Sequence, residues 1–389
     1  MSAAHVQSGP TVAHAMRAYL APTETFVHNQ ITNLRRHRPI VLAHHRRPGT
    51  ETELGEGVIA DERLRPRLAA MERGAYRGAR VALPSGVAAL ARYAREQDAR
   101  LLHYHYLTDA RFLLGVARRT GLPAIASAYG YDVTEFPHMY RGLGLRYLRA
   151  VFERLDCVLA MTEDMRDDVI ALGCPPAKVE VHYHGSPTGR FRHDGRVYEA
   201  GAPLTVLCCA RLEPIKGQDL VVEAMTRLAP RLARDVRVVF VGDGTTRDRL
   251  ACAVREAGLE DRVTFAGHVP HDSPALVQHY ARADVFVHPS ITIRGIKEGI
   301  PGTIVEAMAA GLPVVATRHG GIPAVIDSGR DGLLVTERDV DALACAIASL
   351  LDEPQARERL GRAAAQRAQE QLDLAPRTAA LERIYDRLA

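Results

Sequence analysis

The sequence predicts an α/β fold with two doubly wound parallel sheets, each with its own core. The chain has 389 residues, which is too long for one ordinary core and fits two domains of roughly 200 residues each. In both halves, short apolar segments typical of buried strands alternate with longer segments of helical periodicity. A polar, glycine-rich stretch at 186–202 separates the two arrays and is the expected linker. We therefore expect domains at 1–185 and 203–374, and a last helix at 375–389 that crosses back to the first domain.

Strands of the first array are predicted where short, mostly apolar runs occur. These runs are 12–20, 39–43, 101–105, 123–128, 157–161 and 179–182. Between them, apolar residues recur three or four positions apart, which is the spacing of one helix face. Helices are expected at 24–34, after Thr23 as N-cap, then over most of 63–100, and at 109–119, 136–153 and 163–172. Residues 48–62 have no such spacing, and a loop is expected there.

The same alternation restarts after the linker. Strands are predicted at 204–209, 236–242, 263–266, 285–288 and 314–316. Helices are predicted at 218–228, 247–257, 302–310 and 375–388. In a doubly wound sheet, ligands bind in the crevice outside the carboxyl ends of the strands. Residues that directly follow a predicted strand are therefore the first candidates for function.

Composition indicates an ordinary globular protein, with 47% hydrophobic and 25% charged residues. No apolar run reaches the roughly 18 residues of a membrane-spanning helix, and the first residues lack the pattern of a secretory signal. The six cysteines form no C-x-x-C pair, so we expect reduced, inert thiols rather than disulfides. These features predict a cytoplasmic protein.

Positive charge is concentrated in the first part of the chain. Residues 1–100 carry 15 Arg against 9 acidic residues, a surplus of +6, whereas the whole chain has a net charge of +4. Such a surface can meet an anionic membrane or a phosphorylated acceptor, or be an ordinary solvated face. The basic stretch lacks interleaved aromatic residues, and no nucleic-acid partner is expected.

The segment EGIPGTIVEAMAAGLPVVAT places two carboxylates, Glu298 and Glu306, around a predicted helix start. A helix N-terminus gathers unpaired N–H groups and a partial positive charge, and so binds an anion such as a diphosphate. Carboxylates facing that anion would repel it. We therefore interpret the two acids as acceptors for hydroxyl groups of a sugar and a ribose.

A basic pair, Arg211 and Lys216, follows the predicted strand 204–209. A guanidinium binds two phosphate oxygens at once and an ammonium acts as a point charge, so together they suit a diphosphate leaving group. The chain contains only three lysines among its 50 basic residues, at positions 178, 216 and 297. A lysine kept in such an arginine-rich chain indicates a need for a compact ammonium.

Several motifs occur in an order that resembles glycosyltransferase family 4, a family of retaining enzymes with the GT-B fold. They are ARLEPIKGQDLVVEA, VGDG, FAGHV, VHPS and EGIPGTIVEAMAAGLPVVATRHGGIPAVI, within 204–335. The motif EGIPGTIVEAMA is similar to the subgroup that builds colanic-acid-type exopolysaccharides. The resemblance implies two Rossmann-like domains facing an interdomain cleft. It also implies transfer of a sugar from a nucleoside-diphosphate sugar to a hydroxyl of a polysaccharide, lipid-linked or natural-product acceptor.

The resemblance assigns roles on the donor side. The donor-binding residues that it implies are Arg211, Lys216, His268, Glu298, Gly299, Gly302, Thr303 and Glu306. Arg211 and Lys216 would neutralise the diphosphate, Glu306 would accept from the ribose and Glu298 from the sugar. His105 would lie against the donor sugar, and the catalytic residues implied are Glu298, His105, Arg211 and Lys216.

The first half resembles the family more loosely, through APTETFVHNQITNL at 21–34 and LLHYHYLTDA at 101–110. The acceptor-binding residues that this similarity implies are Thr23, Glu24, Thr25, Tyr129 and Asp132. Many relatives have a His-Gly pair where this chain has Tyr129-Gly130, so only acceptor binding is carried over to that position.

No cofactor and no metal are expected beside the donor. The pairs His103/His105 and His182/His184 each place two imidazoles on one predicted strand face, but no acidic partner accompanies them. Two other functions stay open at this point. A sugar-nucleotide epimerase on the same fold would not depend on an acceptor. A non-catalytic nucleotide-sugar-binding subunit would tolerate loss of Arg211, Lys216 or Glu298.

Overall fold

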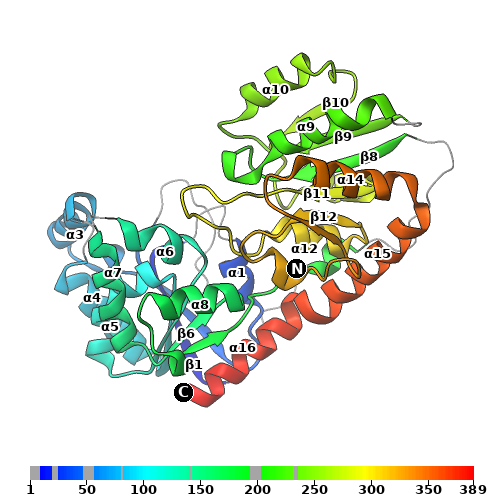
Figure 1. Cartoon of the computed structure of the whole chain (residues 1–389). Coiled ribbons are helices and arrows are strands. Elements are labelled where there is room, and N and C mark those ends of the chain that lie inside the picture. The colour runs from blue at the N-terminus through cyan, green and yellow to red at the C-terminus, as the bar shows by residue number, and fades with distance from the viewer. Residues whose placement is uncertain are drawn as a thin grey trace. The chain divides into compact units, whose positions relative to one another are not determined.

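The computed structural model of the chain describes residues 9–19, 25–46, 57–79, 82–139, 142–192, 203–231 and 235–389. The chain divides into two compact units (Figure 1). Unit 1 is Met1–Gly185 with Leu374–Ala389, and unit 2 is Ser186–Asp373. Each unit is built around one parallel sheet, which is the α/β architecture that the alternating pattern predicts.

Unit 1 contains a seven-stranded sheet in the order β3-β2-β1-β4-β5-β6-β7. Its strands are β1 Thr11–Tyr19, β2 Arg38–Arg46, β3 Gly57–Ile59, β4 Ala99–His105, β5 Ala124–Ser127, β6 Cys157–Ala160 and β7 Val179–Val181. All pairings are parallel. The strand order reverses between β1 and β4, and their carboxyl ends mark the place where such a sheet binds ligands.

Helices cover both faces of this sheet. They are α1 Thr25–Thr32, α2 Ala60–Arg63, α3 Pro66–Ala79, α4 Pro84–Glu96, α5 Leu107–Thr120, α6 Tyr131–Thr134, α7 Leu143–Arg154, α8 Glu163–Ala171 and α16 Leu374–Leu388. Short 3₁₀ turns occur at Phe136–His138 and Pro176–Lys178. Leu90 of α4, Leu113 of α5 and Phe152 of α7 are buried in the main core on one face.

The last helix of the chain, α16, packs on the other face of unit 1. Leu381 and Tyr385 are fully buried against Val12 of β1 and Leu101 of β4. The Tyr385 hydroxyl also lies 2.6 Å from Nδ1 of His103 in β4. A segment more than 180 residues from the rest of unit 1 therefore completes its core.

Unit 2 contains a six-stranded parallel sheet in the order β10-β9-β8-β11-β12-β13. Its strands are β8 Leu204–Cys209, β9 Val236–Val241, β10 Val263–Gly267, β11 Val285–His288, β12 Val314–Thr317 and β13 Leu333–Val335. The order reverses between β8 and β11. The predicted basic pair follows β8, and Glu298 follows β11, so this reversal brings them to one edge of the sheet.

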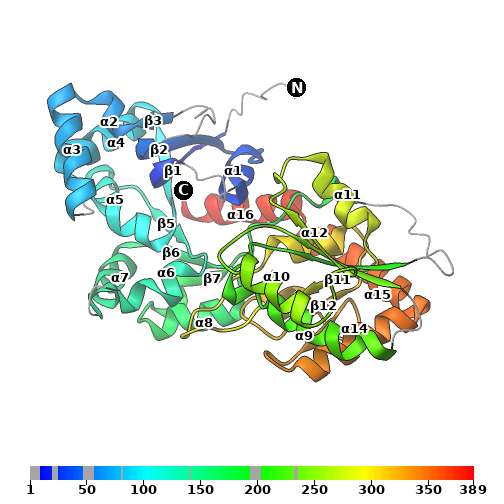
Figure 2. The same cartoon turned by 90° about the horizontal axis from the view of Figure 1, so that it is seen from above.

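Helices connect the successive strands of unit 2 and follow the last one. They are α9 Gln218–Leu228, α10 Arg247–Glu256, α11 Pro274–Arg282, α12 Gly302–Ala309, α13 Ile322–Val325, α14 Val340–Asp352 and α15 Pro354–Arg367. Short turns lie at Thr188–Arg190, Pro214–Lys216, Ala229–Arg231 and, as a π-helical turn, Ala368–Leu372. Figure 2 shows α9 and α14 side by side, and their apolar residues share one core with β8 and β9.

Three expectations differ from the structure. The predicted loop at 48–62 contains the strand β3 and the start of the helix α2. Val58 and Ile59 of β3 are buried, and β3 pairs with β2. The predicted helix at 63–100 is two helices, since Pro84 begins α4, and β4 already starts at Ala99.

The start of the predicted linker is also folded. Thr188 donates to Oδ1 of Asp373, and Phe191 is 1% exposed. Residues 186–192 therefore pack within unit 2, and 193–202 lie outside the described residues.

Across the described parts of the chain, no helix combines the length and the apolar character needed to cross a membrane.

Candidate active site

The centre of the candidate site is an ion pair between Lys216 and Glu298 at the carboxyl edge of the unit 2 sheet. Lys216 ends a 3₁₀ turn after β8, and its Nζ contacts Oε1 of Glu298. The Ser290 hydroxyl, just after β11, donates to Oε2 of Glu298 at 2.5 Å. Both side chains of the ion pair are largely buried, at 13% and 16% exposed. Two residues that were assigned to the donor side from separate motifs are therefore in direct contact.

This environment keeps Glu298 ionised. Burial opposes ionisation, but the Lys216 ammonium and then His288 hold the pKa of Glu298 below its usual range. Nε2 of His288, in β11, lies 3.7 Å from Oε2 of the carboxylate. Burial lowers the pKa of His288, so at neutral pH the fixed charges here are Glu298 and Lys216.

A glycine allows the two loops to meet. Gly217 has φ of +65°, and a Cβ atom on it would lie 2.1 Å from the carbonyl oxygen of Pro289. A side chain at this position would force the loop after β8 away from the loop after β11. Gly217 therefore allows Lys216 to reach Glu298.

Arg211 differs from Lys216 in that its side chain is exposed. It follows β8 by two residues, and its backbone carbonyl accepts a 2.9 Å hydrogen bond from Nε2 of Gln218. Among the described residues, no carboxylate forms an ion pair with its guanidinium. The backbone of Arg211 is thus held in place, and its exposed guanidinium can bind a phosphate.

The N-terminus of α12 lies beside this site in sequence and belongs to the same sheet edge. Its first residue, Gly302, is exposed, and the preceding Pro301 provides no side-chain cap. The first backbone bond at this end joins Ile304 N–H to the Pro301 carbonyl at 3.1 Å. The amides of Gly302 and Thr303 therefore have the positions of the unpaired donors that bind anions at helix starts.

Glu306 lies one turn inside α12 and is 6% exposed. Its carboxylate is 2.9 Å from Nε2 of His271 and accepts a 2.7 Å hydrogen bond from the Tyr280 hydroxyl. The hydrogen bond to Glu306 raises the pKa of His271, and burial raises that of Tyr280. Neither His271 nor Tyr280 was predicted. Both lie on or before α11, in a segment without a recognisable motif.

Two other donor-side residues are less enclosed. Gly299 is half-buried between Glu298 and the start of α12, and His268 is exposed directly after β10.

In unit 1, His105 lies at the end of β4 and is 1% exposed. Its Nε2 is 3.0 Å from Nδ1 of His14, and its Nδ1 is 3.1 Å from the Tyr129 hydroxyl. Burial, and then His14, place the pKa of His105 well below its usual range. The ring predicted to lie against a sugar is thus neutral and bonded to the protein through both nitrogens.

Asp132 does not have the geometry of an acceptor-binding residue. It is fully buried, and its carboxylate accepts from the backbone N–H groups of Leu107 at 2.9 Å, Tyr129 at 3.0 Å and Gly130 at 3.1 Å. Burial raises the pKa of Asp132 despite these bonds. The prediction for Asp132 is corrected: it fixes the loop after β5, whereas Tyr129 remains partly exposed.

The other predicted acceptor residues lie near α1. Thr25 is its exposed first residue, whereas Thr23 and Glu24 lie outside the described residues.

Three buried histidines of unit 1, His14, His103 and His105, have ligand atoms within 4.8 Å of one another. His103 already lies 2.6 Å from the Tyr385 hydroxyl and 2.8 Å from Oγ of Ser127. Both ring nitrogens of His103 and of His105 thus already have hydrogen-bond partners within the protein. We interpret the group as a hydrogen-bonded network of neutral rings.

Two family models match the chain, one over most of its first half and one over most of its second half. "Glycosyltransferase Family 4" matches residues 23–190, and "Glycosyl transferases group 1" matches residues 194–367.

Among curated proteins, the chain is 38% identical over 201 residues to a putative colanic acid biosynthesis glycosyltransferase, WcaL, of Salmonella typhimurium. That match covers 51% of this chain and 48% of the relative, so it spans about half of the relative's length. The chain is also 33% identical to a GDP-mannose-dependent phosphatidylinositol monomannoside mannosyltransferase of Mycobacterium tuberculosis, over 67% of this chain and 69% of that protein.

Solved structures with the same fold cover nearly the whole chain. HepE from Anabaena, solved with UDP, gives a TM-score of 0.75 at 18% identity over 97% of this chain and 100% of that chain. Sucrose-phosphate synthase from Thermosynechococcus elongatus gives 0.74 at 20% identity, over 98% and 99%. With its two parallel-sheet, Rossmann-like units, the chain belongs to the family 4 glycosyltransferases of the GT-B fold.

Proposed function

We propose that the chain is a retaining glycosyltransferase, which moves a sugar from a nucleoside diphosphate to an acceptor hydroxyl. The observation that carries this proposal is the contact of Lys216 and Glu298 at the point where the unit 2 sheet reverses its strand order. That edge is where doubly wound sheets bind nucleotides. At this edge, Lys216 provides a cation for the phosphates and Glu298 a hydrogen-bond acceptor for the sugar hydroxyls.

Donor binding rearranges this ion pair. In the structure described here, Glu298 neutralises Lys216. A diphosphate carries more negative charge than one carboxylate and competes for the ammonium, while Arg211 supplies a second, uncompensated cation. Glu298, still bonded to Ser290, is then free to accept from the hydroxyls of the donor sugar.

The transfer step breaks the bond between the anomeric carbon and the diphosphate oxygen. The acceptor oxygen bonds to the same face of that carbon, and its proton passes to the departing diphosphate. Negative charge grows on the diphosphate, so Lys216, Arg211 and the first amides of α12 stabilise the transition state more than the bound donor. No protein nucleophile and no metal is part of this proposal.

The ribose would bind at Glu306. His271 and Tyr280 fix its carboxylate but leave lone pairs on both oxygens for the ribose hydroxyls. In unit 1, Tyr129 and Thr25 remain candidates for the acceptor. His105 would act through Tyr129, since both of its ring nitrogens are bonded.

The decisive experiment measures acceptor-dependent sugar transfer from UDP-, GDP- and ADP-sugars. Lys216→Ala and Glu298→Gln are expected to lower kcat/KM by about 10²–10³, the usual effect of losing one transition-state contact. Lys178→Ala is the matched control, because Lys178 bonds only backbone carbonyls of unit 1 in the described structure, such as that of Leu155 at 2.7 Å.

The outcome also separates the two rival functions. Conversion of the donor without an acceptor would indicate an epimerase. Donor binding without any conversion would indicate a binding subunit. Unchanged transfer in both site variants would contradict the proposed mechanism.

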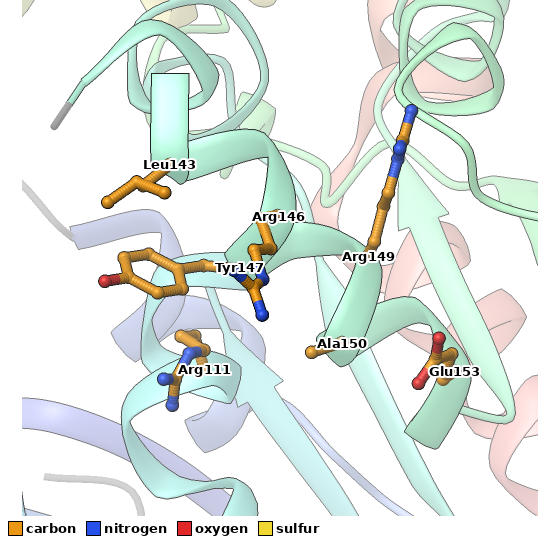
Figure 3. Close-up of a pocket in the computed structure, with 7 residues that line it drawn as sticks. All are labelled: Arg111, Leu143, Arg146, Tyr147, Arg149, Ala150 and Glu153. Atoms are coloured by element: carbon orange, nitrogen blue, oxygen red, sulfur yellow. The ribbon is translucent and has the colours of Figure 1, made fainter. Parts of the chain in front are cut away.

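We also propose that the acceptor side works at an anionic membrane surface, from the cytoplasm. Supporting this, helices α5 and α7 of unit 1 border a cavity of about 530 Å³, where Arg111 and Arg146 lie beside Tyr147 (Figure 3). The Arg111 guanidinium is 4.9 Å from the centre of the Tyr147 ring. Among the described residues, neither arginine forms an ion pair with a carboxylate, and Leu143, which also lines the cavity, is 45% exposed.

The membrane proposal is tested by co-sedimentation with vesicles of phosphatidylglycerol or of phosphatidylcholine. Binding to the anionic vesicles alone is expected, and the double variant R111E/R146E should lose it. The control R330E/R362E reverses two exposed arginines of unit 2. Equal binding by all three proteins would contradict the proposal.

A further inference from the structure

The backbone at Glu298 is held on both sides by one short segment. The N–H of Glu298 donates to Nε2 of His319 at 3.1 Å, and its carbonyl accepts from Gly321 N–H at 3.2 Å. Gly320, between them, has φ of +46°, and a Cβ there would lie 2.1 Å from the Glu298 carbonyl oxygen. These residues directly follow β12, so the loop after β11 is fastened to the loop after the neighbouring strand.

This contact requires one tautomer of His319. A backbone amide can only donate, so Nε2 of His319 must carry a lone pair and the ring proton must sit on Nδ1. The Nδ1–H group donates a hydrogen bond to Oε1 of Glu337, 2.8 Å from Nδ1. His319 is fully buried, and a ring with the wrong tautomer would leave two buried polar contacts broken.

Glu337 is itself held as an ionised acceptor. It follows β13, and its carboxylate accepts from Thr292 N–H at 2.7 Å and from the Thr292 hydroxyl at 2.9 Å. Burial opposes ionisation, but the bonds from Thr292 and His319 keep the pKa of Glu337 below its usual value. Thr292 lies between Ser290 and Glu298, so Glu337 fixes the same loop at a second point.

We propose that His319 is a positioning residue for the donor sugar, and that Glu337 sets the tautomer that it needs. The inference rests on the proposed function and deepens it. His319 touches no reacting atom. It holds the Glu298 backbone, and thereby sets where the Glu298 carboxylate and the following start of α12 meet the donor.

Two substitutions separate the two nitrogens of the ring. In His319→Gln, the side-chain oxygen reaches the position of Nε2 and still accepts from Glu298 N–H. In His319→Asn, the amide lies near the position of Nδ1, so the contact with Glu337 survives and the one with Glu298 is lost. Both variants remove the ring, so each controls for the effect of the other on packing.

Steady-state transfer kinetics and thermal unfolding are measured for both variants and the unsubstituted chain. His319→Asn should raise the donor KM about tenfold, the size of one buried hydrogen bond, and leave the acceptor KM unchanged. His319→Gln should stay within about threefold of the unsubstituted chain. An equal change in donor KM for the two variants, or no change in either, would overturn the inference.

Two further results are separable from this one. Absence of transfer by the unsubstituted chain would refute the proposed function itself. If His319→Asn does not fold, the same measurements are made on Glu337→Met. Glu337 is partly exposed, and Met lacks the carboxylate that accepts the hydrogen bond from Nδ1 of His319. That variant should also raise the donor KM alone, and an unchanged donor KM would overturn the inference.

Discussion

At the scale of residues, the site depends on carboxylates that are already bonded within the protein. Glu298 contacts Lys216 and Ser290, and Glu306 contacts His271 and Tyr280. Such partners fix the direction of each carboxylate before the donor arrives, which reduces the entropy lost on binding. The residues that bond to Glu298 and Glu306 are therefore as important for donor binding as the two carboxylates themselves.

Tyr280→Phe tests this arrangement at Glu306. It removes the 2.7 Å hydrogen bond to Oε2 and leaves the buried ring in place. Glu306 should then be less well oriented, and the donor KM should rise about five- to tenfold at nearly unchanged kcat. Tyr131→Phe, at a 43% exposed position in unit 1, is the matched control. A lowered kcat with normal donor KM would show that Tyr280 acts elsewhere.

Residue identity alone revealed only part of this site. Glu298, Glu306, Arg211 and Lys216 stand in recognisable motifs, because their spacing from strand ends and a helix start carries the chemistry. His319 and Glu337 belong to the same site, but their pairing joins loops after two different strands, and no local spacing predicts it. Asp132 was misread because burial cannot be seen in a short motif.

At the scale of elements, α16 packs against segments of unit 1 that lie more than 300 residues earlier in the sequence. Glu382 of α16 is 2% exposed, and its Oε1 accepts from the backbone N–H groups of Arg35 at 2.8 Å, Arg36 at 2.6 Å and His37 at 3.3 Å. These amides precede β2 and have no strand partner there. A carboxylate far along the chain therefore replaces the missing backbone acceptors.

Glu382→Ala should be strongly destabilising. It leaves the amide of the buried His37, and the part-buried amides of Arg35 and Arg36, without this acceptor, and we expect a loss of about 2–4 kcal/mol in the free energy of unfolding. Asp386→Ala is the control on the same helix, because Asp386 is 43% exposed and its pair with Arg36 contributes less than about 1 kcal/mol. Urea unfolding followed by circular dichroism measures both. Equal losses would contradict the account of α16.

Periodicity located the elements well where one face is apolar, as in α5 and α9. It failed at β3, whose three residues are too few to show a pattern, and at the segment 63–100, where two helices were read as one. For β3 the deciding contact is its pairing with β2, whereas the break between α3 and α4 is local and falls where Pro84 begins α4.

At the scale of the whole molecule, unit 1 contains buried neutral histidines that make its stability depend on pH. Burial lowers the pKa of His14 and of His182 to about 3, and that of His184 to about 4. The pKa values of His103 and His105 also lie well below the usual one, mainly because of burial. Below pH about 6.5, the unfolded chain binds protons that the folded unit does not.

Stability should therefore fall as the pH decreases from about 6.5. Each of these histidines should cost roughly 1.4 kcal/mol at pH 5.5 relative to neutral pH, so unit 1 should lose several kcal/mol. Hydrogen exchange in urea at pH 7.5 and 5.5, analysed separately for β1 and β4 and for β8 and β11, would reveal a larger loss in unit 1. An equal or larger loss in unit 2 would contradict the prediction.

The central claim is that Lys216 binds the diphosphate of the donor. The most direct measurement compares the thermal shift caused by UDP, GDP and ADP with that caused by their monophosphates, in the unsubstituted chain and in Lys216→Ala. One nucleoside diphosphate at about 100 times its Kd should stabilise the unsubstituted chain by about 2.7 kcal/mol. The corresponding monophosphate at the same concentration should stabilise it clearly less. Lys216→Ala should lose that difference, whereas an unchanged preference for the diphosphate in Lys216→Ala would contradict the account.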